Sequence, residues 1–328
     1  MKIILYRTLL FPRSKNILVS TSNETRLILE VGEMDDISEL LGCRYPIIQG
    51  AMSVICNPEM VAAISEAGGY GLLATGFQSD PDLLVSQIRA VRGITEKPFG
   101  ANLMALNPDS PKFAEVLVEA GIKAVTTSAG NPKDLVSLLK PQGVKIFHVV
   151  PNVDNAIKAQ DAGVDAVIAE GSESGGIQGY QGASTMVLVP MVVDAVNIPV
   201  VAAGGIGDAR GYRAAFALGA KGVQVGTRFV VSKECISHRN YKEAICEAKE
   251  TDTVLVERDR VRVRALRTPL SEELLKRRGD STSMPSAESL NKAWTEGDLK
   301  ADVLAAGQVA GMIKSVKSVR EIIVEMVR

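Results

Sequence analysis

Residues 198–227, IPVVAAGGIGDARGYRAAFALGAKGVQVGT, decide the fold. They begin and end with short, largely apolar runs, 198–203 and 221–225, of the kind found in strands that are buried on both faces of a parallel sheet. Leu218-Gly219 closes the helix between the runs, because glycine adopts the left-handed conformation of a helix end without a Cβ penalty. This strand–helix–strand unit predicts an α/β fold with parallel strands.

The same unit repeats between Tyr45 and Val231. Apolar, β-rich runs alternate with helical segments such as 58–68, in which Met60, Ile64 and Ala67 recur at helical spacing. The runs are YPIIQG (45–50), YGLLAT (70–75), PFGANL (98–103), KAVTTS (123–128), VKIFHVV (144–150), DAVIAEG (165–171), IPVVAAGG (198–205) and KGVQVGT (221–227). A doubly wound open sheet has the same local signals, but eight strands favour a (β/α)8 TIM barrel over residues 34–231.

The two flanking regions differ from the barrel pattern. Residues 1–33 contain basic residues but no continuous apolar stretch with a cleavage site, so we expect a peripheral extension, with Met34 as an alternative start. Residues 232–328 are charged and mixed, which predicts a helical C-terminal cap or lid. In its last helix we expect one apolar face that docks on the body, made of Val316, Val319, Ile322, Ile323 and Met326.

Composition excludes several classes of protein. The 328 residues carry 37 Lys+Arg against 38 Asp+Glu, a net charge of −1, which argues against a nucleic-acid or membrane-surface partner. Four cysteines without CxxC spacing, and only His148 and His238, argue against a metal site or a disulfide framework. We therefore expect a cytoplasmic protein with a small-molecule substrate. The sequence leaves a homodimer open.

The chemistry of such a barrel lies at the carboxyl ends of its strands. The seventh strand ends in Gly204-Gly205 and the eighth in Gly226-Thr227. Glycine lets the backbone approach a ligand closely, and barrels often hold a phosphate between these two turns. Although such turns can simply close a barrel, their presence after both strands predicts a phosphate site.

Three other strand ends suggest a flat ligand. The loop after strand six, 170–182, is rich in glycine, although it could also be an ordinary mobile surface loop. Strand one ends in Gly50, Ala51 and Met52, and strand three contains Asn102, residues that suit the face and edge of a large heterocycle. Together these turns predict a phosphorylated, planar cofactor in the barrel mouth.

The chain resembles a known family over residues 36–328. The runs that carry the resemblance keep their order along the chain: YPIIQGAM, AGGYGLL, KPFGANLM, TTSAGNP, AGVDAVIAEGSESGG, IPVVAAGGIGD and GAKGVQVGTRF. They are similar to the FMN-dependent nitronate monooxygenase, or 2-nitropropane dioxygenase-like, family, which includes flavin-dependent enoyl-acyl-carrier-protein reductases. The tail, with VRALRTP (263–269), AWTEGDL (293–299) and AAGQVAGMI (305–313), is more similar to the enoyl-reductase branch.

The resemblance implies FMN as cofactor and assigns residues to it. The phosphate would lie on Gly204, Gly205, Gly226 and Thr227. The isoalloxazine ring would lie against Gly50, Ala51, Met52, Asn102, Glu170, Gly175 and Gly176. NADH or NADPH is the electron donor in the reductase branch.

One departure from the family bears on the mechanism. Both branches place a histidine, the usual acid–base candidate, directly after the Gly-Gly of strand six, whereas this chain has Ile177. His148, Tyr180 and Gln181 are weak candidates to replace it, because a lone histidine on a strand is more often a packed side chain. The catalytic residue is therefore unassigned.

Three activities fit these observations. Nitronate oxidation with O₂ needs no base, because a nitronate is already deprotonated, so Ile177 favours it. The tail favours enoyl-thioester reduction, which needs a proton donor; NAD(P)H:acceptor reduction needs little acid chemistry. A non-catalytic FMN-binding protein is the hypothesis from another class.

The arginines of residues 258–267 also have two interpretations. They could bind substrate phosphates. Alternatively, Arg260, Arg262 and Arg264 alternate with apolar residues, which is the pattern of a half-exposed strand and is the interpretation we favour.

Overall fold

The structure is a computed structural model of the chain. It describes residues 17–21, 24–28, 37–180, 182–259, 261–277 and 284–328. The chain divides into two compact units, residues 1–36 and 37–328. In the first, β1 (Ile17–Thr21) and β2 (Glu24–Ile28) pair as an antiparallel hairpin that the sequence did not predict.

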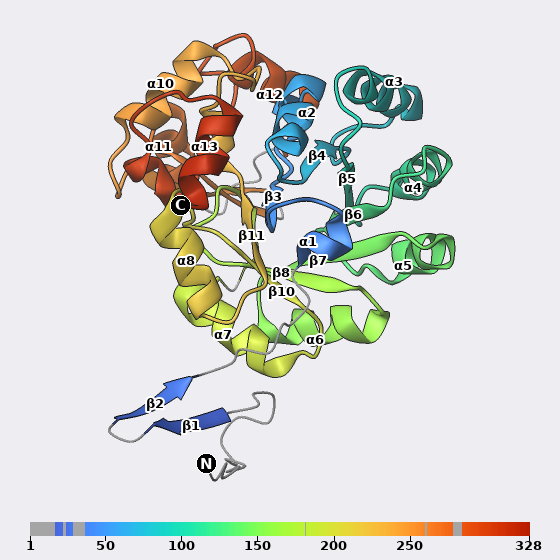
Figure 1. Ribbon diagram of the computed structural model, residues 1–328. Helices are drawn as coiled ribbons and strands as arrows, with labels where there is room; N and C mark the ends of the chain where they lie inside the picture. The colour runs from blue at the N-terminus through green and yellow to red at the C-terminus, as the bar shows by residue number, and fades with distance from the viewer. Residues whose placement is uncertain (1–16, 22–23, 29–36, 181, 260, 278–283) are drawn as a thin grey trace. The chain divides into compact units, whose positions relative to one another are not determined.

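The second unit is built around a barrel of eight parallel strands (Figure 1). The strands follow the chain around the barrel, each pairing with its neighbour: β3 (Ile47–Gln49), β4 (Gly71–Ala74), β5 (Phe99–Met104), β6 (Ala124–Ser128), β7 (Lys145–Val150), β8 (Ala166–Glu170), β10 (Val200–Ala203) and β11 (Gly222–Val225). A parallel bridge between Ile48 and Tyr70 joins the first strand to the start of the second. The predicted (β/α)8 barrel is confirmed, because all eight apolar runs form its strands.

Helices between the strands form the outer ring in Figure 1. They are α2 (Pro58–Glu66), α3 (Pro81–Arg92), α4 (Ser110–Glu119), α5 (Lys133–Leu139), α6 (Val153–Ala162), α7 (Thr185–Ala195) and α8 (Ala209–Ala217), and α1 (Ile37–Leu41) precedes the first strand. Local signals set their ends: Asp80 caps α3, Asn152 caps α6, and Gly163 ends α6 in the left-handed conformation. Within the described ranges no helix is long and apolar enough to cross a membrane.

The last helix, α13 (Val319–Met326), packs against α2 and α8. It therefore occupies the place of the eighth barrel helix. Its buried face contains four of the five predicted residues, Val319, Ile322, Ile323 and Met326. The fifth, Val316, was predicted wrongly: it precedes the helix and is 43% exposed.

Between β11 and α13 the chain forms a cap, whose helices gather beside α2 in Figure 1. Its helices are α9 (Thr227–Val230), α10 (Arg239–Glu247), α11 (Pro269–Lys276) and α12 (Ala287–Trp294). The cap also contains a hairpin of β12 (Thr253–Arg258) and β13 (Val261–Leu266), and β13 pairs with β9 (Gly176–Gln178) from the loop after β8. The strand that the alternating arginines indicated is thus β13, and the three-stranded sheet is an addition to the predicted helices.

A buried ion pair holds the cap together. A guanidinium nitrogen of Arg258 lies 2.9 Å from Asp302 Oδ1, and Asp302 is 1% exposed. Ser289 Oγ, on α12, donates to the other Asp302 oxygen at 2.6 Å. The hairpin, the helix and the segment before α13 therefore meet at one carboxylate.

Candidate functional site

A cavity of about 450 Å³ opens at the carboxyl ends of the strands and is bordered by the cap. All site residues predicted from the sequence except Gln181 line it: Gly50, Ala51, Met52, Asn102, His148, Glu170, Gly175, Gly176, Ile177, Tyr180, Gly204, Gly205, Gly226 and Thr227. The barrel thus brings into one cavity residues spread over nearly 180 positions of the chain.

The turns after β10 and β11 lie side by side, because these strands are hydrogen-bonded neighbours. Gly204 has φ +100°, and a Cβ atom there would lie 2.9 Å from both Gly171 O and Thr185 Oγ1. Gly205 also has a positive φ, +71°. Both positions therefore require glycine for conformational reasons, before any ligand is considered.

Gly226 differs from Gly204. Among the described residues, a Cβ atom on Gly226 would meet only Met52 Sδ, at 3.8 Å, which is an ordinary contact. No described neighbour requires glycine there, so the small residue leaves space in the cavity. Beside it, Thr227 Oγ1 accepts a hydrogen bond from Gly307 N at 3.0 Å, which leaves the hydroxyl proton for another acceptor.

The first half of the barrel contributes a rigid wall. Met52 N donates to Cys56 Sγ at 2.9 Å, and Asn102 is held on both sides, donating to Ser128 Oγ at 3.1 Å and accepting from Thr126 Oγ1 at 2.9 Å. Ser53 (φ +49°) and Ala129 (φ +51°), both lining the cavity, lie in the left-handed region. Such conformations cost about 1–3 kcal/mol and cluster at functional sites.

The glycine-rich loop forms the wall next to the cap. Its strand β9 places Ile177 opposite Val263 of β13, in a small apolar cluster. A Cβ atom on Gly175 would lie 2.6 Å from Gly307 N, so close approach of the cap backbone already requires glycine there. Gly176 (φ +83°) has no atom of a described residue within 4 Å of its missing Cβ.

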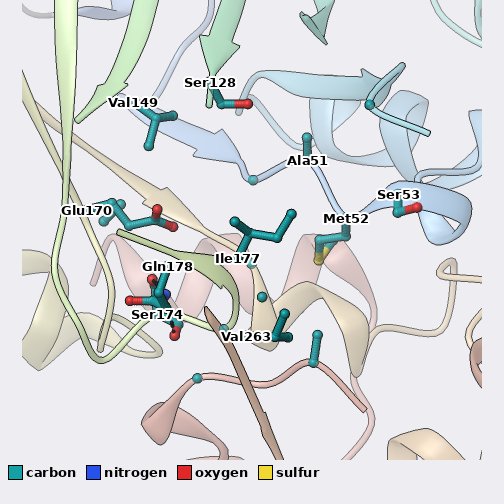
Figure 2. Close-up of a pocket in the computed structure, with 18 of the residues that line it drawn as sticks. Ala51, Met52, Ser53, Ser128, Val149, Glu170, Ser174, Ile177, Gln178 and Val263 are labelled. Carbon is teal, nitrogen blue, oxygen red and sulfur yellow. Dashed lines mark hydrogen bonds between the residues drawn. The ribbon is translucent and has the colours of Figure 1, made fainter. Parts of the chain in front are cut away.

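Glu170, at the end of β8, is the acidic group of this wall. Burial raises the pKa of its carboxyl group to about 7, and a hydrogen bond with the Ser174 side chain opposes that rise. Figure 2 shows the Glu170 carboxyl group pointing into the cavity toward Ile177. Because a pKa near 7 lets the group both hold and release a proton, Glu170 can take part in proton transfer.

The weak candidates for the missing histidine lie less favourably. His148 Nδ1 is 2.8 Å from Thr127 Oγ1, and burial lowers the pKa of the imidazole to about 4, so the ring is a poor base near neutral pH. Tyr180 is 58% exposed and lies under the guanidinium of Arg262, at 5.7 Å from the ring centre. Gln181 lies outside the described residues.

The arginines of the cap are bound to the protein itself. Arg264 is buried and donates from Nε to Ser172 O at 2.7 Å. Arg258 pairs with Asp302, and Arg267 pairs with Glu272. Arg260 lies outside the described residues. These contacts support the structural interpretation of the cluster.

Sequence reasoning assigned no role to several residues that line the cavity. Ser174 and Gln178 belong to the glycine-rich loop, whose composition gave a signal for the loop but none for these side chains. The cap contributes Val263, Leu290, Trp294 and Val303. Of these four residues, only Val263 had a signal in the sequence, the alternation of residues 260–265. That alternation predicted a strand but not which of its two faces would line the cavity.

Comparison with known proteins agrees with this architecture. The family model of nitronate monooxygenase matches residues 35–328. A "probable nitronate monooxygenase" of Staphylococcus saprophyticus is 37% identical over 67% of this chain and 74% of the relative.

Two solved structures are also similar. FabK from Thermotoga maritima is 40% identical with a TM-score of 0.80, covering 88% of this chain and 94% of that one. A nitroalkane oxidase from Streptomyces ansochromogenes is 26% identical with a TM-score of 0.76, covering 88% and 97%.

The family model matches the whole of the second unit, including the cap. Proteins of this family and its structural neighbours are flavin enzymes, so the hypothesis of a non-catalytic protein is set aside. The chain belongs to the nitronate monooxygenase family and is a flavin-dependent oxidoreductase.

Proposed function

We propose that the protein is an FMN-dependent oxidoreductase that oxidises alkyl nitronates with O₂. The observation that carries this proposal is Ile177, which lies in the cavity where the family's histidine would stand. A nitronate carries its negative charge before it binds, so its oxidation makes no demand on an acid or base at that position.

The residues of the cavity fit FMN. Gly204, Gly205 and Gly226 would leave backbone close to the phosphate, and the Thr227 hydroxyl retains a proton that it can donate to a phosphate oxygen. The missing Cβ of Gly226 supports this fit, since a methyl group there would fill cavity space rather than clash with protein. When bound, FMN supplies the electron-accepting chemistry.

The other walls would hold the ring and the substrate. Gly50, Ala51 and Met52 offer small and soft apolar contacts, and the fixed amide of Asn102 offers a polar one. Apolar side chains of the cap line the opposite side of the cavity, where they would exclude water and so strengthen electrostatic interactions inside it.

An anaerobic titration of the purified protein tests this proposal. We expect FMN on extraction of the cofactor and bleaching of the visible flavin spectrum by ethylnitronate but not by NADH or NADPH. A colourless protein that takes up no FMN would contradict the cofactor assignment, and a flavin that ethylnitronate leaves oxidised would contradict the activity.

One observation favours a second activity, NAD(P)H-dependent reduction of an enoyl thioester carried by coenzyme A or an acyl carrier protein. The cap side of the cavity is apolar, with Val263, Leu290, Trp294 and Val303, and could accept an acyl chain. The similarity to FabK, an enoyl-acyl-carrier-protein reductase, supports the same activity. Prompt bleaching by NADH or NADPH, followed by reoxidation with crotonyl-CoA, would favour it over nitronate oxidation.

A further inference from the structure

We propose that Glu170 is the general base that removes the Cα proton of a neutral nitroalkane, so that the enzyme accepts nitroalkanes as well as nitronates. This inference rests on the proposed function and extends its substrate class. It assigns to the Glu170 carboxylate, on β8, the role that Ile177 cannot perform.

The geometry of the loop after β8 carries the proposal. Glu170 is the last residue of β8, and its carboxyl group points into the cavity that Ile177 also lines (Figure 2). Ile177 lies in the middle of β9, on the strand that closes the same loop. The side chain of a base at position 170 and that of a histidine at position 177 would thus reach the same part of the cavity from two ends of one loop.

Two neighbours hold the Glu170 side chain in place. The Ser174 side chain lowers the pKa of the Glu170 carboxyl group and so favours its charged form, and Gln178 Nε2 donates to Ser174 Oγ at 2.5 Å and to Ser174 O at 2.9 Å. Gln178 is itself fixed, because it pairs with Arg262 in the sheet of the cap. A base needs this kind of support to stay within reach of the proton that it removes.

The other ionisable side chains that line the cavity are poorly suited to this role. His148, on β7, is bonded to Thr127 and stays neutral because its pKa lies at about 4. Glu173 accepts hydrogen bonds from Thr185 N and Oγ1, and its charge attracts the nearby Arg264. Tyr180 lies at the exposed rim.

Tyr241 is the remaining ionisable side chain among the described residues that line the cavity. It lies on α10 of the cap, its hydroxyl donates to Ala305 O, and burial raises its pKa far above the neutral range. Among the cavity residues that the structure describes, Glu170 thus has both the exposure to the cavity and a pKa, about 7, near working pH.

The step involves one proton and no change of oxidation state. The Cα–H bond of the nitroalkane breaks, its electron pair moves into the nitro group to give the nitronate, and the proton forms an O–H bond with a Glu170 carboxylate oxygen. The nitronate then follows the proposed reaction, and the proton returns from Glu170 to solvent. Protonated Glu170 can donate a hydrogen bond to the nitronate until then.

The test compares nitroethane with ethylnitronate, which differ by this one proton. We expect Glu170→Gln to lower kcat/KM for nitroethane about 10²–10⁴-fold more than it lowers kcat/KM for ethylnitronate. With the wild type, kcat/KM for nitroethane should rise with pH around a midpoint near pH 7 that is absent with ethylnitronate. Equal losses on both substrates, or no loss on either, would overturn the proposal.

Variants of two neighbouring residues, Ser174 and Glu173, test whether the pH midpoint belongs to the Glu170 carboxyl group. Ser174→Ala removes a hydrogen bond that favours the carboxylate, so the midpoint should move to higher pH, and Ser174→Thr should restore it. Glu173→Gln is the matched control, a second carboxylate of the same loop that is bound to Thr185. It should leave the midpoint in place whatever its effect on rate.

A measurement without turnover distinguishes failure of this proposal from failure of the proposed function. Under anaerobic conditions in D₂O, proton NMR follows exchange of the Cα hydrogens of nitroethane. Exchange faster with the wild type than with Glu170→Gln supports the base even if neither nitro compound is oxidised. Equal exchange with both proteins would contradict it, even if ethylnitronate is oxidised.

Discussion

Two sides of the cavity are built in different ways. The turns after β10 and β11 are made of backbone, and their glycines lie within thirty residues of each other on adjacent strands. The loop after β8 instead depends on the cap, because Ile177 pairs with Val263 and Gly175 lies against the backbone of Gly307.

The two sides of the cavity therefore depend on different parts of the chain. The side expected to hold the cofactor phosphate is local in sequence: it consists of the turns after two neighbouring barrel strands, with one hydrogen bond from the cap, Gly307 N to Thr227 Oγ1. The side that contains Glu170 and Ile177 takes its geometry from distant residues. Changes in the cap should therefore alter the side that contains Glu170 and Ile177 more than they alter the two glycine turns, and four predictions test that comparison.

The largest effect should follow from removing the carboxylate that holds the cap. Asp302→Ala leaves the buried Arg258 charge without its ion pair, which we expect to lower the free energy of unfolding by about 3–5 kcal/mol. Urea unfolding measures this loss. As a control, Glu243→Gln removes an exposed ion pair with Arg239 and should change stability little. A loss for Asp302→Ala no larger than the control's would contradict the role of the pair.

The next effect concerns the junction between barrel and cap. The raised pKa of Glu170, about 7 against the ordinary 4.5, means that the folded protein holds a proton that the unfolded chain releases between these pH values. Stability contributed by this group is therefore greatest below pH 4.5 and falls as pH rises to 7.

Glu170→Gln removes this dependence. Relative to the wild type without cofactor, the variant should gain stability as pH rises, by at most about 3 kcal/mol above pH 7. Urea unfolding of both proteins at about pH 5 and pH 8 measures the gain. A difference that is the same at both pH values would show that the carboxyl group has an ordinary pKa.

On the barrel side, two glycines should separate folding from cofactor binding. Gly204→Ala forces a Cβ atom into a positive φ and against Gly171 O, at a cost of about 1–3 kcal/mol in stability. Gly226→Ala causes no clash with the protein, so we expect its stability to change by less than about 0.5 kcal/mol and its FMN affinity to fall about tenfold or more. Urea unfolding and flavin fluorescence titration measure the two quantities. Unchanged FMN affinity of Gly226→Ala would remove Gly226 from the phosphate site.

The smallest effect should come from restoring the family's histidine. Ile177→His places an imidazole without evolved support beside Glu170, so we expect about a tenfold gain with nitroethane and little change with ethylnitronate. Steady-state kinetics with both substrates measure the gain, and Ile177→Val, which stays apolar, is the control. If both variants gained activity with nitroethane, the gain would come from the changed shape of the cavity at position 177 rather than from proton transfer by the imidazole.

The barrel and the positions of its turns were predictable from the sequence because their signals are local. Each strand of the barrel is a short apolar run, and Gly204 and Gly226 directly follow two of them. The pairing of β9 with β13 was not predictable, because it joins segments far apart in the chain and the three residues Gly176–Gln178 have no strand pattern.

Other features could not be predicted from the sequence for related reasons. The left-handed conformations of Ser53 and Ala129 are imposed by the surrounding fold on residues that do not favour them. Val316 fitted the helical spacing of the last apolar face, but Ser318 caps the helix just after it. The pKa of Glu170 depends on burial, which the sequence cannot give.

The hydrogen bond from Gly307 N to Thr227 Oγ1 joins the two sides of the cavity. If Thr227 holds the cofactor, then binding and closure of the cap are thermodynamically linked, and each must favour the other by the same free energy. Amide hydrogens of residues 305–309 should then exchange with solvent more slowly in the loaded protein.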